Sequence, residues 1–287
     1  MGGLFAILAL ISWGVGDFLI QKSTRKFGDW LSLFYITGSI SIVLLPFIYQ
    51  DLPALFNNSY NLLILICAGL VSTFAALCLF EGLREGKISI VEPIFALEII
   101  VTAFLAQWFL QEKIALWQFS FIITLILGVA LVSIKSLAHF KNFKLEAGVL
   151  IAVLATIGMG AENFLYGLGA RLTNPLLVNW FASLIVALIT LGFIIYKKQT
   201  PKILSELKAR PGLIFWMSLL DNVSWIFYTF SIIYIPMALA TGISEGYVAL
   251  AILLGLWLNH EKIKFHQIIG LVLTLLSAVV LLVSLNF

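Results

Sequence analysis

Ten apolar stretches of membrane-spanning length follow one another along this chain of 287 residues. Each approaches the roughly 20 apolar residues that an α-helix needs to cross a bilayer. They lie at approximately 3–20, 31–50, 61–80, 88–109, 116–134, 147–168, 176–196, 212–233, 238–258 and 265–286. Only 11% of the residues are charged, against about 25% in soluble domains. We therefore predict an all-α integral membrane protein with ten transmembrane helices.

The second half of the sequence repeats the first half. At an offset of 146 residues Gly14 corresponds to Gly160, and Asp17 corresponds to Asn163. Beyond the longer loop the offset becomes 149, and Glu112-Lys113-Ile114 then corresponds to Glu261-Lys262-Ile263. Two copies of one helical unit are therefore expected.

The two units span residues 1–137 and 146–287, and each contains five predicted spans. Because five is odd, the second unit must be inverted in the membrane relative to the first. Inverted repeats are typical of secondary transporters, in which the substrate site lies near the bilayer midplane between the repeats.

The basic residues predict the orientation of the chain. Fifteen of the 17 Lys and Arg residues follow spans 1, 3, 5, 7 and 9, and only Lys113 and Arg171 lie on the opposite side. The positive-inside rule then places both termini outside the cytoplasm. We expect a multi-pass protein of the plasma (inner) membrane. The net charge of +3 comes from these loops, and no nucleic-acid partner is expected.

Acidic residues within the spans are the strongest indication of a functional site. A charged side chain at the centre of a spanning helix costs about 2.5–3.5 kcal/mol on insertion scales. A neutral carboxyl group can carry a proton through such a site, and an ionised one can bind a cation. No Lys or Arg lies well inside a span. The intramembrane acids are Asp17, Glu92, Glu98, Glu162, Asp221 and Glu245.

Polar and aromatic residues accompany two of these acids. Asp221, Trp225 and Tyr228 follow a spacing of i, i+4 and i+7, which places them on one face of a helix. Thr241 lies one turn before Glu245. An aromatic ring beside a carboxylate can hold an organic cation through its π face. We include Trp225, Tyr228 and Thr241 with the six acids as candidate substrate-binding or proton-binding residues.

Helix-breaking residues interrupt the fourth and ninth spans at corresponding places. Pro93 opens one of these stretches, and Pro236, Gly242 and Gly246 interrupt the other. Unwound backbone is tolerated within a membrane only where it lines a cavity or is buried in protein.

The five-plus-five layout, the fourth span opened by Pro93 and the Glu-Lys pairs that close spans 4 and 9 resemble the drug/metabolite transporter superfamily, EamA type, over the whole chain. The resemblance implies a central cavity lined by spans 1, 3, 4, 6, 8 and 9. It also implies transport of amino acids, other metabolites or drugs, often by export. The better-known members have cytoplasmic termini, whereas the basic residues predict the reverse here.

We therefore expect a secondary active transporter that works by alternating access, coupled to protons or operating by exchange. The predicted substrate is a small cationic, zwitterionic or neutral organic metabolite resembling an amino acid. No enzymatic activity, cofactor or metal site is expected. The expected partners are the substrate, protons and the lipid bilayer, with the chain acting as a monomer.

Two alternatives remain open. One is a proton-antiporting exporter of lipophilic cations, which would use the same acids in a more aromatic cavity. The other is an intramembrane aspartyl hydrolase, because Gly14-Val15-Gly16-Asp17 matches the GxGD pattern of such enzymes. Their mechanism needs two aspartates that share a proton, and Asp221 is the other intramembrane aspartate.

Overall fold

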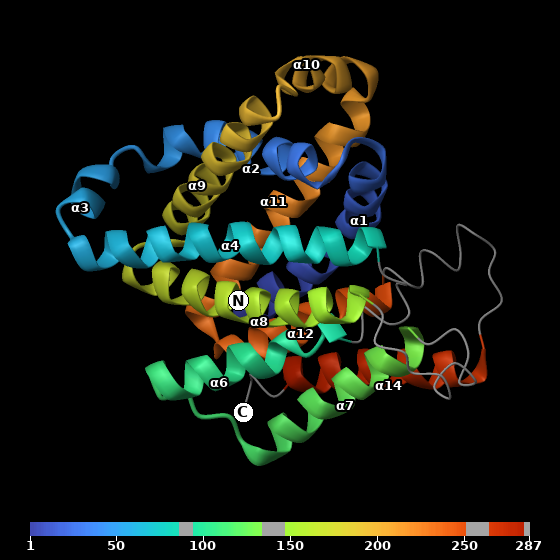
Figure 1. Cartoon of the computed structure of the whole chain (residues 1–287). Helices are drawn as coiled ribbons and strands as arrows, with labels where there is room; N and C mark the ends of the chain where they lie inside the picture. Colours follow the sequence, from blue (N-terminus) through green and yellow to red (C-terminus); the bar gives the residue numbers. More distant parts are fainter. Residues whose placement is uncertain (86–93, 134–146, 251–263, 284–287) are drawn as a thin grey trace.

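The computed structural model describes residues 1–85, 94–133, 147–250 and 264–283, and every regular element in these ranges is a helix (Figure 1). The predicted all-α class is confirmed for this part of the chain.

Each predicted span overlaps one helix. In the first repeat these helices are α1 (Gly2–Phe27), α2 (Asp29–Ile48), α4 (Ser59–Glu85), α6 (Glu98–Leu110) and α7 (Leu116–Ser133). In the second they are α8 (Ala147–Leu172), α9 (Pro175–Tyr196), α11 (Pro211–Tyr234), α12 (Met237–Ser244) and α14 (Phe265–Val283). Two short helices, α3 (Leu52–Phe56) and α10 (Thr200–Ala209), lie in connections that the sequence predicted as loops.

Seven helices in the described ranges are long and apolar enough to cross a membrane: α1, α2, α4, α8, α9, α11 and α14. The apolar helices α6 and α7 are shorter. Large hydrophobic side chains such as Phe47, Phe104 and Trp108 are exposed, as expected for surfaces in contact with lipid. The chain is an integral multi-pass membrane protein. The count of ten spans remains a prediction, because spans 4 and 9 fall partly on residues 86–93 and 251–263, outside the described ranges.

Local sequence explains where several helices begin and end. Gly28, with φ of 91°, separates α1 from α2, and glycine adopts this left-handed conformation without steric cost. The side chain of Asn174 caps α9 by accepting a hydrogen bond from the backbone N–H of Leu177 at 2.8 Å. Pro175 occupies the first turn of that helix, where its missing N–H costs no hydrogen bond.

The helices pack in a pattern that is unchanged when the two repeats are exchanged. Helix α4 packs against α8, and correspondingly α11 packs against α1. Helix α2 packs on its counterpart α9, and α7 packs on its counterpart α14 (Figure 1). A two-fold relation between the repeats produces this set of contacts.

Both repeats contain a helix break at the same place. Ala96 and Leu97 form a turn between helical residues on either side, and Glu245 and Gly246 form the corresponding turn after α12. The backbone bonds Leu97 N–H to Ile94 C=O at 3.1 Å and Gly246 N–H to Ile243 C=O at 3.2 Å tighten both turns in the same way. The two breaks therefore interrupt α-helical bonding next to Glu98 and at Glu245.

Glycines allow α1 and α8 to approach these broken segments. A Cβ atom on Gly160 would lie 2.5 Å from Cβ of Val101, and one on Gly14 would lie 2.8 Å from Cδ2 of Leu250. Val101 and Leu250 are repeat counterparts at the offset of 149, as Gly14 and Gly160 are at 146. The same close contact between the repeats therefore occurs twice, each time from a glycine of one repeat to a residue of the other.

Gly160→Ala is expected to destabilise the protein, because the new methyl group would overlap Val101 and the carbonyl oxygen of Glu98. Overpacking of this kind costs about 1–3 kcal/mol. The matched control is Gly192→Ala in α9, where a Cβ atom meets nothing within 4 Å and alanine favours the helix by roughly 0.4–1 kcal/mol. Thermal unfolding of the purified proteins should give a lower Tm for the first variant only. Equal Tm values would contradict the packing described.

Candidate functional site

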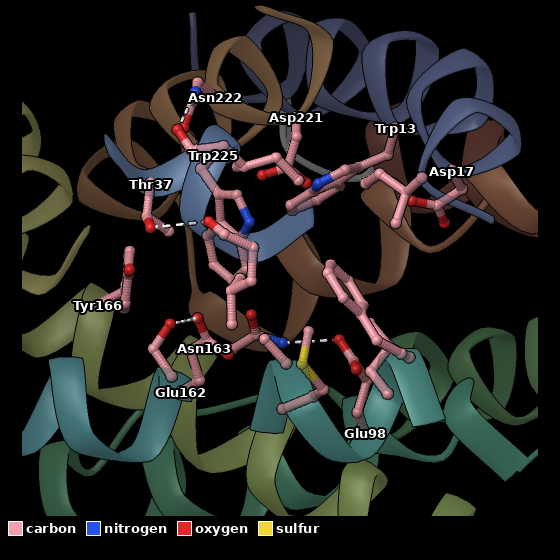
Figure 2. Close-up of a pocket in the computed structure, with 18 of the residues that line it drawn as sticks. Trp13, Asp17, Thr37, Glu98, Glu162, Asn163, Tyr166, Asp221, Asn222 and Trp225 are labelled. Carbon is pink, nitrogen blue, oxygen red and sulfur yellow. Dashed lines mark hydrogen bonds between the residues drawn. The ribbon is translucent and has the colours of Figure 1, made fainter. Parts of the chain in front are cut away.

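One cavity lies between the two repeats, and five carboxyl groups line it (Figure 2). All five are acids that the sequence singled out, and both repeats contribute: Asp17 on α1, Glu98 at the start of α6, Glu162 on α8, Asp221 on α11 and Glu245 in the break after α12. No Lys, Arg or His is present among the described residues that line the cavity. Clustered carboxyl groups in such a setting favour a cation or a proton.

Aromatic donors hold the two aspartates. The indole N–H of Trp13 donates a hydrogen bond to Asp221, and the hydroxyl of Tyr247 donates one to Asp17. Figure 2 shows Trp13 between the two aspartates. The ring of Trp13 also lies edge-on to Trp225, with centroids 5.3 Å apart. Each aspartate therefore has its own aromatic donor, an arrangement different from the shared proton of an aspartyl hydrolase.

Glu98 and Glu245 meet across the cavity at the two helix breaks. Their side chains are hydrogen-bonded to each other, and Nδ2 of Asn163 donates to Oε1 of Glu98 at 2.8 Å. Both acids are buried, with 7% and 4% of their surfaces exposed. Because an ionised carboxylate only accepts hydrogen bonds, two carboxyl groups can bond to each other only when one of them carries a proton. A pair in this geometry can hold one proton between its two carboxyl groups.

Glu162 differs from the other acids because one of its oxygens has no partner among the described residues. The hydroxyl of Ser72 donates to Oε1 at 2.6 Å, and Tyr166 is hydrogen-bonded to Ser72 and Ser183 in turn. Oε2 is buried without a hydrogen-bond partner in the described part of the chain. Glu162 lines the cavity and is only 2% exposed, so a residue of the cavity wall carries this unsatisfied acceptor.

Repeat counterparts account for two of these partners. Tyr247 corresponds to Glu98 at the offset of 149, so the bond between Tyr247 and Asp17 matches the bond between Glu98 and Asn163. The repeat pairs Asp17 with Asn163, whereas Tyr247 was not among the predicted site residues. The offset of 149 applied to Glu98 leads to Tyr247, so the repeat pattern contained the information needed to identify this residue.

Ser72 was missed in the same way. It corresponds to Asp221 at the offset of 149, and its partner Glu162 corresponds to Gly16 at 146. A Cβ atom on Gly16 would lie 3.7 Å from the backbone nitrogen of Asp221, so this contact also occurs in both repeats. At this pair of corresponding positions, only the second repeat has a carboxyl group, that of Glu162.

The cavity extends toward the end of the molecule where α1 ends and α2 begins. Leu33, four residues into α2, and Phe80, five residues before the end of α4, both line it. Toward the other end of the molecule, Trp225 is the last residue of α11 that lines the cavity. One turn farther on, Tyr228 is buried and its hydroxyl lies 2.7 Å from Oγ1 of Thr241. The candidates Tyr228 and Thr241 thus lie behind the cavity wall, and Glu92 lies outside the described residues.

A charged contact joins several helices at that same end, and we call it the Arg171–Glu112 clamp. Nη1 of Arg171, near the end of α8, lies 2.6 Å from Oε1 of Glu112. Its Nε and Nη2 donate to the carbonyl oxygen of Ile232 at 3.0 and 2.7 Å. Oε2 of Glu112 accepts from the backbone N–H of Met237 at 2.8 Å. The clamp therefore joins the segment after α6 to α8, to the end of α11 and to the start of α12.

The sequence matches the model of the EamA-like transporter family twice, over residues 1–134 and 146–283. The chain belongs to this family. It is therefore a membrane transporter of the drug/metabolite type, and the resemblance identified from the sequence is confirmed.

Two further comparisons found similar proteins. The uncharacterized protein MJ1333.1 of Methanocaldococcus jannaschii is 26% identical over 135 residues, which is 46% of this chain and 96% of that protein. The relative is thus about as long as one EamA repeat. A solved structure described only as a crystal structure of a protein has a TM-score of 0.70 at 14% identity, covering 97% of this chain and 95% of its own. That similarity shows the fold alone.

Arg171→Gln is expected to loosen the closed end of this EamA-like protein. The variant removes charge-assisted hydrogen bonds that contribute about 1.5–3 kcal/mol. A loss of this size would raise the fraction of molecules in which this end is open by a factor of ten or more. The readout is thiol labelling at Ala240→Cys, which is fully buried behind the clamp, with Cys67 and Cys78 replaced by serine. The matched control is Arg210→Gln, which breaks the ion pair between Arg210 and Glu206 at α10. An unchanged labelling rate in Arg171→Gln would contradict a closing role for the clamp.

Proposed function

We propose that this protein is a proton-coupled transporter of a small organic metabolite, and that the cavity between the repeats is its substrate pathway. The observation that carries the proposal is the set of five acids around one cavity with no cationic side chain among its described lining residues. Acids placed within a membrane in this way are functional by default. The EamA family membership supports transport as the activity.

Glu98 and Glu245 form the coupling site in this proposal. They lie at the two helix breaks, where interrupted helices create substrate and ion sites in inverted-repeat transporters. Movement of one repeat against the other would separate the two carboxyl groups. The affinity of the pair for the shared proton would then change. The titratable or polar groups near this pair are Asn163 and Glu162 on α8, Asp17 on α1 and Tyr228 on α11.

In this proposal the structure represents one state of an alternating-access cycle, in which the cavity is directed toward one end of the molecule. The cavity reaches toward the end of α4 at Phe80, while the Arg171–Glu112 clamp and the bond between Tyr228 and Thr241 lie at the other end. The distribution of basic residues favours a cytoplasmic position for the first end. Substrate and proton would then enter or leave this state on the cytoplasmic side.

The surroundings of the acids favour a cationic substrate over a zwitterionic or neutral one. Export of lipophilic cations is the second candidate function, and the aromatic group formed by Trp13, Tyr166, Trp225 and Tyr247 favours it. Such rings can bind a cation that has no hydrogen-bond donor. Direct comparison of lipophilic cations with protonated amines separates these two candidates.

Glu98→Gln and Glu245→Gln are expected to abolish proton-driven accumulation and to leave substrate exchange intact. Glutamine keeps the shape of the side chain but cannot take up a proton at this site. Proteoliposomes that contain a pH-sensitive dye would be screened with amines, amino acids, sugars and lipophilic cations, and the active compound would then be followed in the variants. We expect accumulation to fall at least tenfold.

The control for this experiment is Glu206→Gln on α10, which lies outside the cavity lining and should accumulate substrate normally. Full accumulation in both cavity variants would remove Glu98 and Glu245 as the coupling site. If no compound class crosses the membrane or moves protons in the wild type, the proposed function is wrong.

Both termini are expected to lie outside the cytoplasm, as the distribution of basic residues predicts. Alkaline phosphatase fused after Phe287 should be active, and a green fluorescent reporter fused there should be dark. The same two reporters inserted between Lys198 and Gln199, just before α10, should give the opposite results. A fluorescent fusion at Phe287 would reverse the assigned orientation and leave the fold unaffected.

A further inference from the structure

We propose that Oε2 of Glu162 binds the protonated amino group of the substrate, and that this substrate is a primary amine without a carboxylate group. The inference rests on the proposed function and deepens it by naming the residue that holds the substrate and the chemical class of the ligand.

The first argument is the unsatisfied oxygen of Glu162. The bond from Ser72 at 2.6 Å fixes Oε1, while Oε2 is buried and has no hydrogen-bond partner in the described ranges. A buried acceptor without a partner costs about 1–3 kcal/mol, and more when it is charged. Because this oxygen belongs to a residue of the cavity wall, a ligand that brings an N–H donor recovers that cost.

The other acids of the cavity already have partners. Asp17 accepts from Tyr247, Asp221 accepts from Trp13, and Glu98 bonds to both Asn163 and Glu245. A substrate that bound any of these groups would have to compete with a bond already formed. Glu162 offers a buried acceptor that has no partner within the described ranges.

An acceptor without a partner favours a ligand with N–H or O–H donors, and a carboxylate favours a donor that is charged. A protonated primary amine has three N–H donors, and a charge-assisted bond to a carboxylate is roughly twice as strong as a neutral one. A quaternary ammonium ion has the same charge but no donor, so it leaves Oε2 unsatisfied. The site therefore discriminates against lipophilic quaternary cations.

The surrounding residues also limit the remainder of the ligand. Beside Glu162, the rings of Tyr166 and Trp225 lie with centroids 4.8 Å apart, and Met159 and Leu79 add apolar surface. An apolar or aromatic body fits this wall. The carboxylate of an amino acid would instead lie among several acids without a cation in the described lining, and like charges brought together are unfavourable.

Among the residues that the structure describes, this acceptor occurs in one repeat only. The repeat counterpart of Glu162 is Gly16, which has no side chain, so the second repeat offers an acceptor that the first does not. One amino group per transport cycle is therefore expected.

The test compares ligands that share one body and differ in one group. Purified full-length protein would be titrated calorimetrically with phenethylamine, N,N,N-trimethylphenethylammonium, phenylalanine and 2-phenylethanol. Isoamylamine, its trimethyl derivative and leucine form a second, aliphatic set. We expect at least one of the two primary amines to bind the wild type, at least tenfold more tightly than its trimethyl, amino-acid and alcohol analogues.

The variant Glu162→Gln keeps an oxygen for Ser72 and places an amide NH₂ where Oε2 lies, so amine binding should weaken at least tenfold. Asp221→Asn tests the competing acid on the facing wall, and Glu206→Gln on α10 is the control outside the cavity. Both should weaken amine binding less than Glu162→Gln does. The ligand comparison in the wild type remains decisive even if Glu162→Gln does not fold.

Equal affinity for an amine and its trimethyl analogue would overturn the proposal, and so would unchanged amine binding in Glu162→Gln. If neither amine binds while phenylalanine, leucine or 2-phenylethanol binds and is transported, the amine assignment fails and the proposed transport function stands. If no ligand binds or is transported, both fail.

Discussion

A carboxyl group inside a membrane has lost the water that would solvate it, and it has to find donors within the protein. In this chain each donor comes from the repeat opposite to the acid that it serves. The pairs are Asn163 with Glu98, Tyr247 with Asp17, Trp13 with Asp221, and Ser72 with Glu162. Glu98 and Glu245 also bond across the same boundary. Neither repeat satisfies its acids alone, so these bonds favour the packing in which the two repeats enclose the cavity.

The backbone frame is nearly symmetric, whereas the chemistry it carries is not. The contacts of Gly14 and Gly160 and the turns at residues 96–97 and 245–246 recur in both repeats. The side chains have diverged: Glu98 corresponds to Tyr247, and Glu162 corresponds to Gly16. Two repeats in one chain can acquire different side chains in this way. If two identical copies of a single-repeat chain formed the same frame, both copies would carry the same residues. A symmetric frame can rock between two equivalent arrangements, and unequal side chains can give proton and substrate separate positions.

The sequence was sufficient for the features that depend on local pattern. Apolar length predicted the helices, and the cost of intramembrane charge singled out the five described acids that line the cavity. The partners of these acids depend on how each helix is rotated about its axis, which no single stretch of sequence determines. Ser72 and Tyr166 therefore resembled ordinary span residues, and Arg171 was counted only as a charge outside the membrane core. Tyr228 shares a helix face with Asp221, yet α12 covers it through Thr241.

An alternating-access transporter needs two states that differ by only a few kcal/mol, since a state that is far more stable could not be left during the cycle. The Arg171–Glu112 clamp has a suitable strength. Its charge-assisted bonds contribute about 1.5–3 kcal/mol, and the partial exposure of Arg171, 30% for its side chain, keeps the guanidinium hydrated enough to separate from its partner. A fully buried pair would cost about 3–5 kcal/mol when broken. A ligand that binds one state roughly a hundredfold more tightly gains about 2.7 kcal/mol, which matches the clamp and is sufficient to open it.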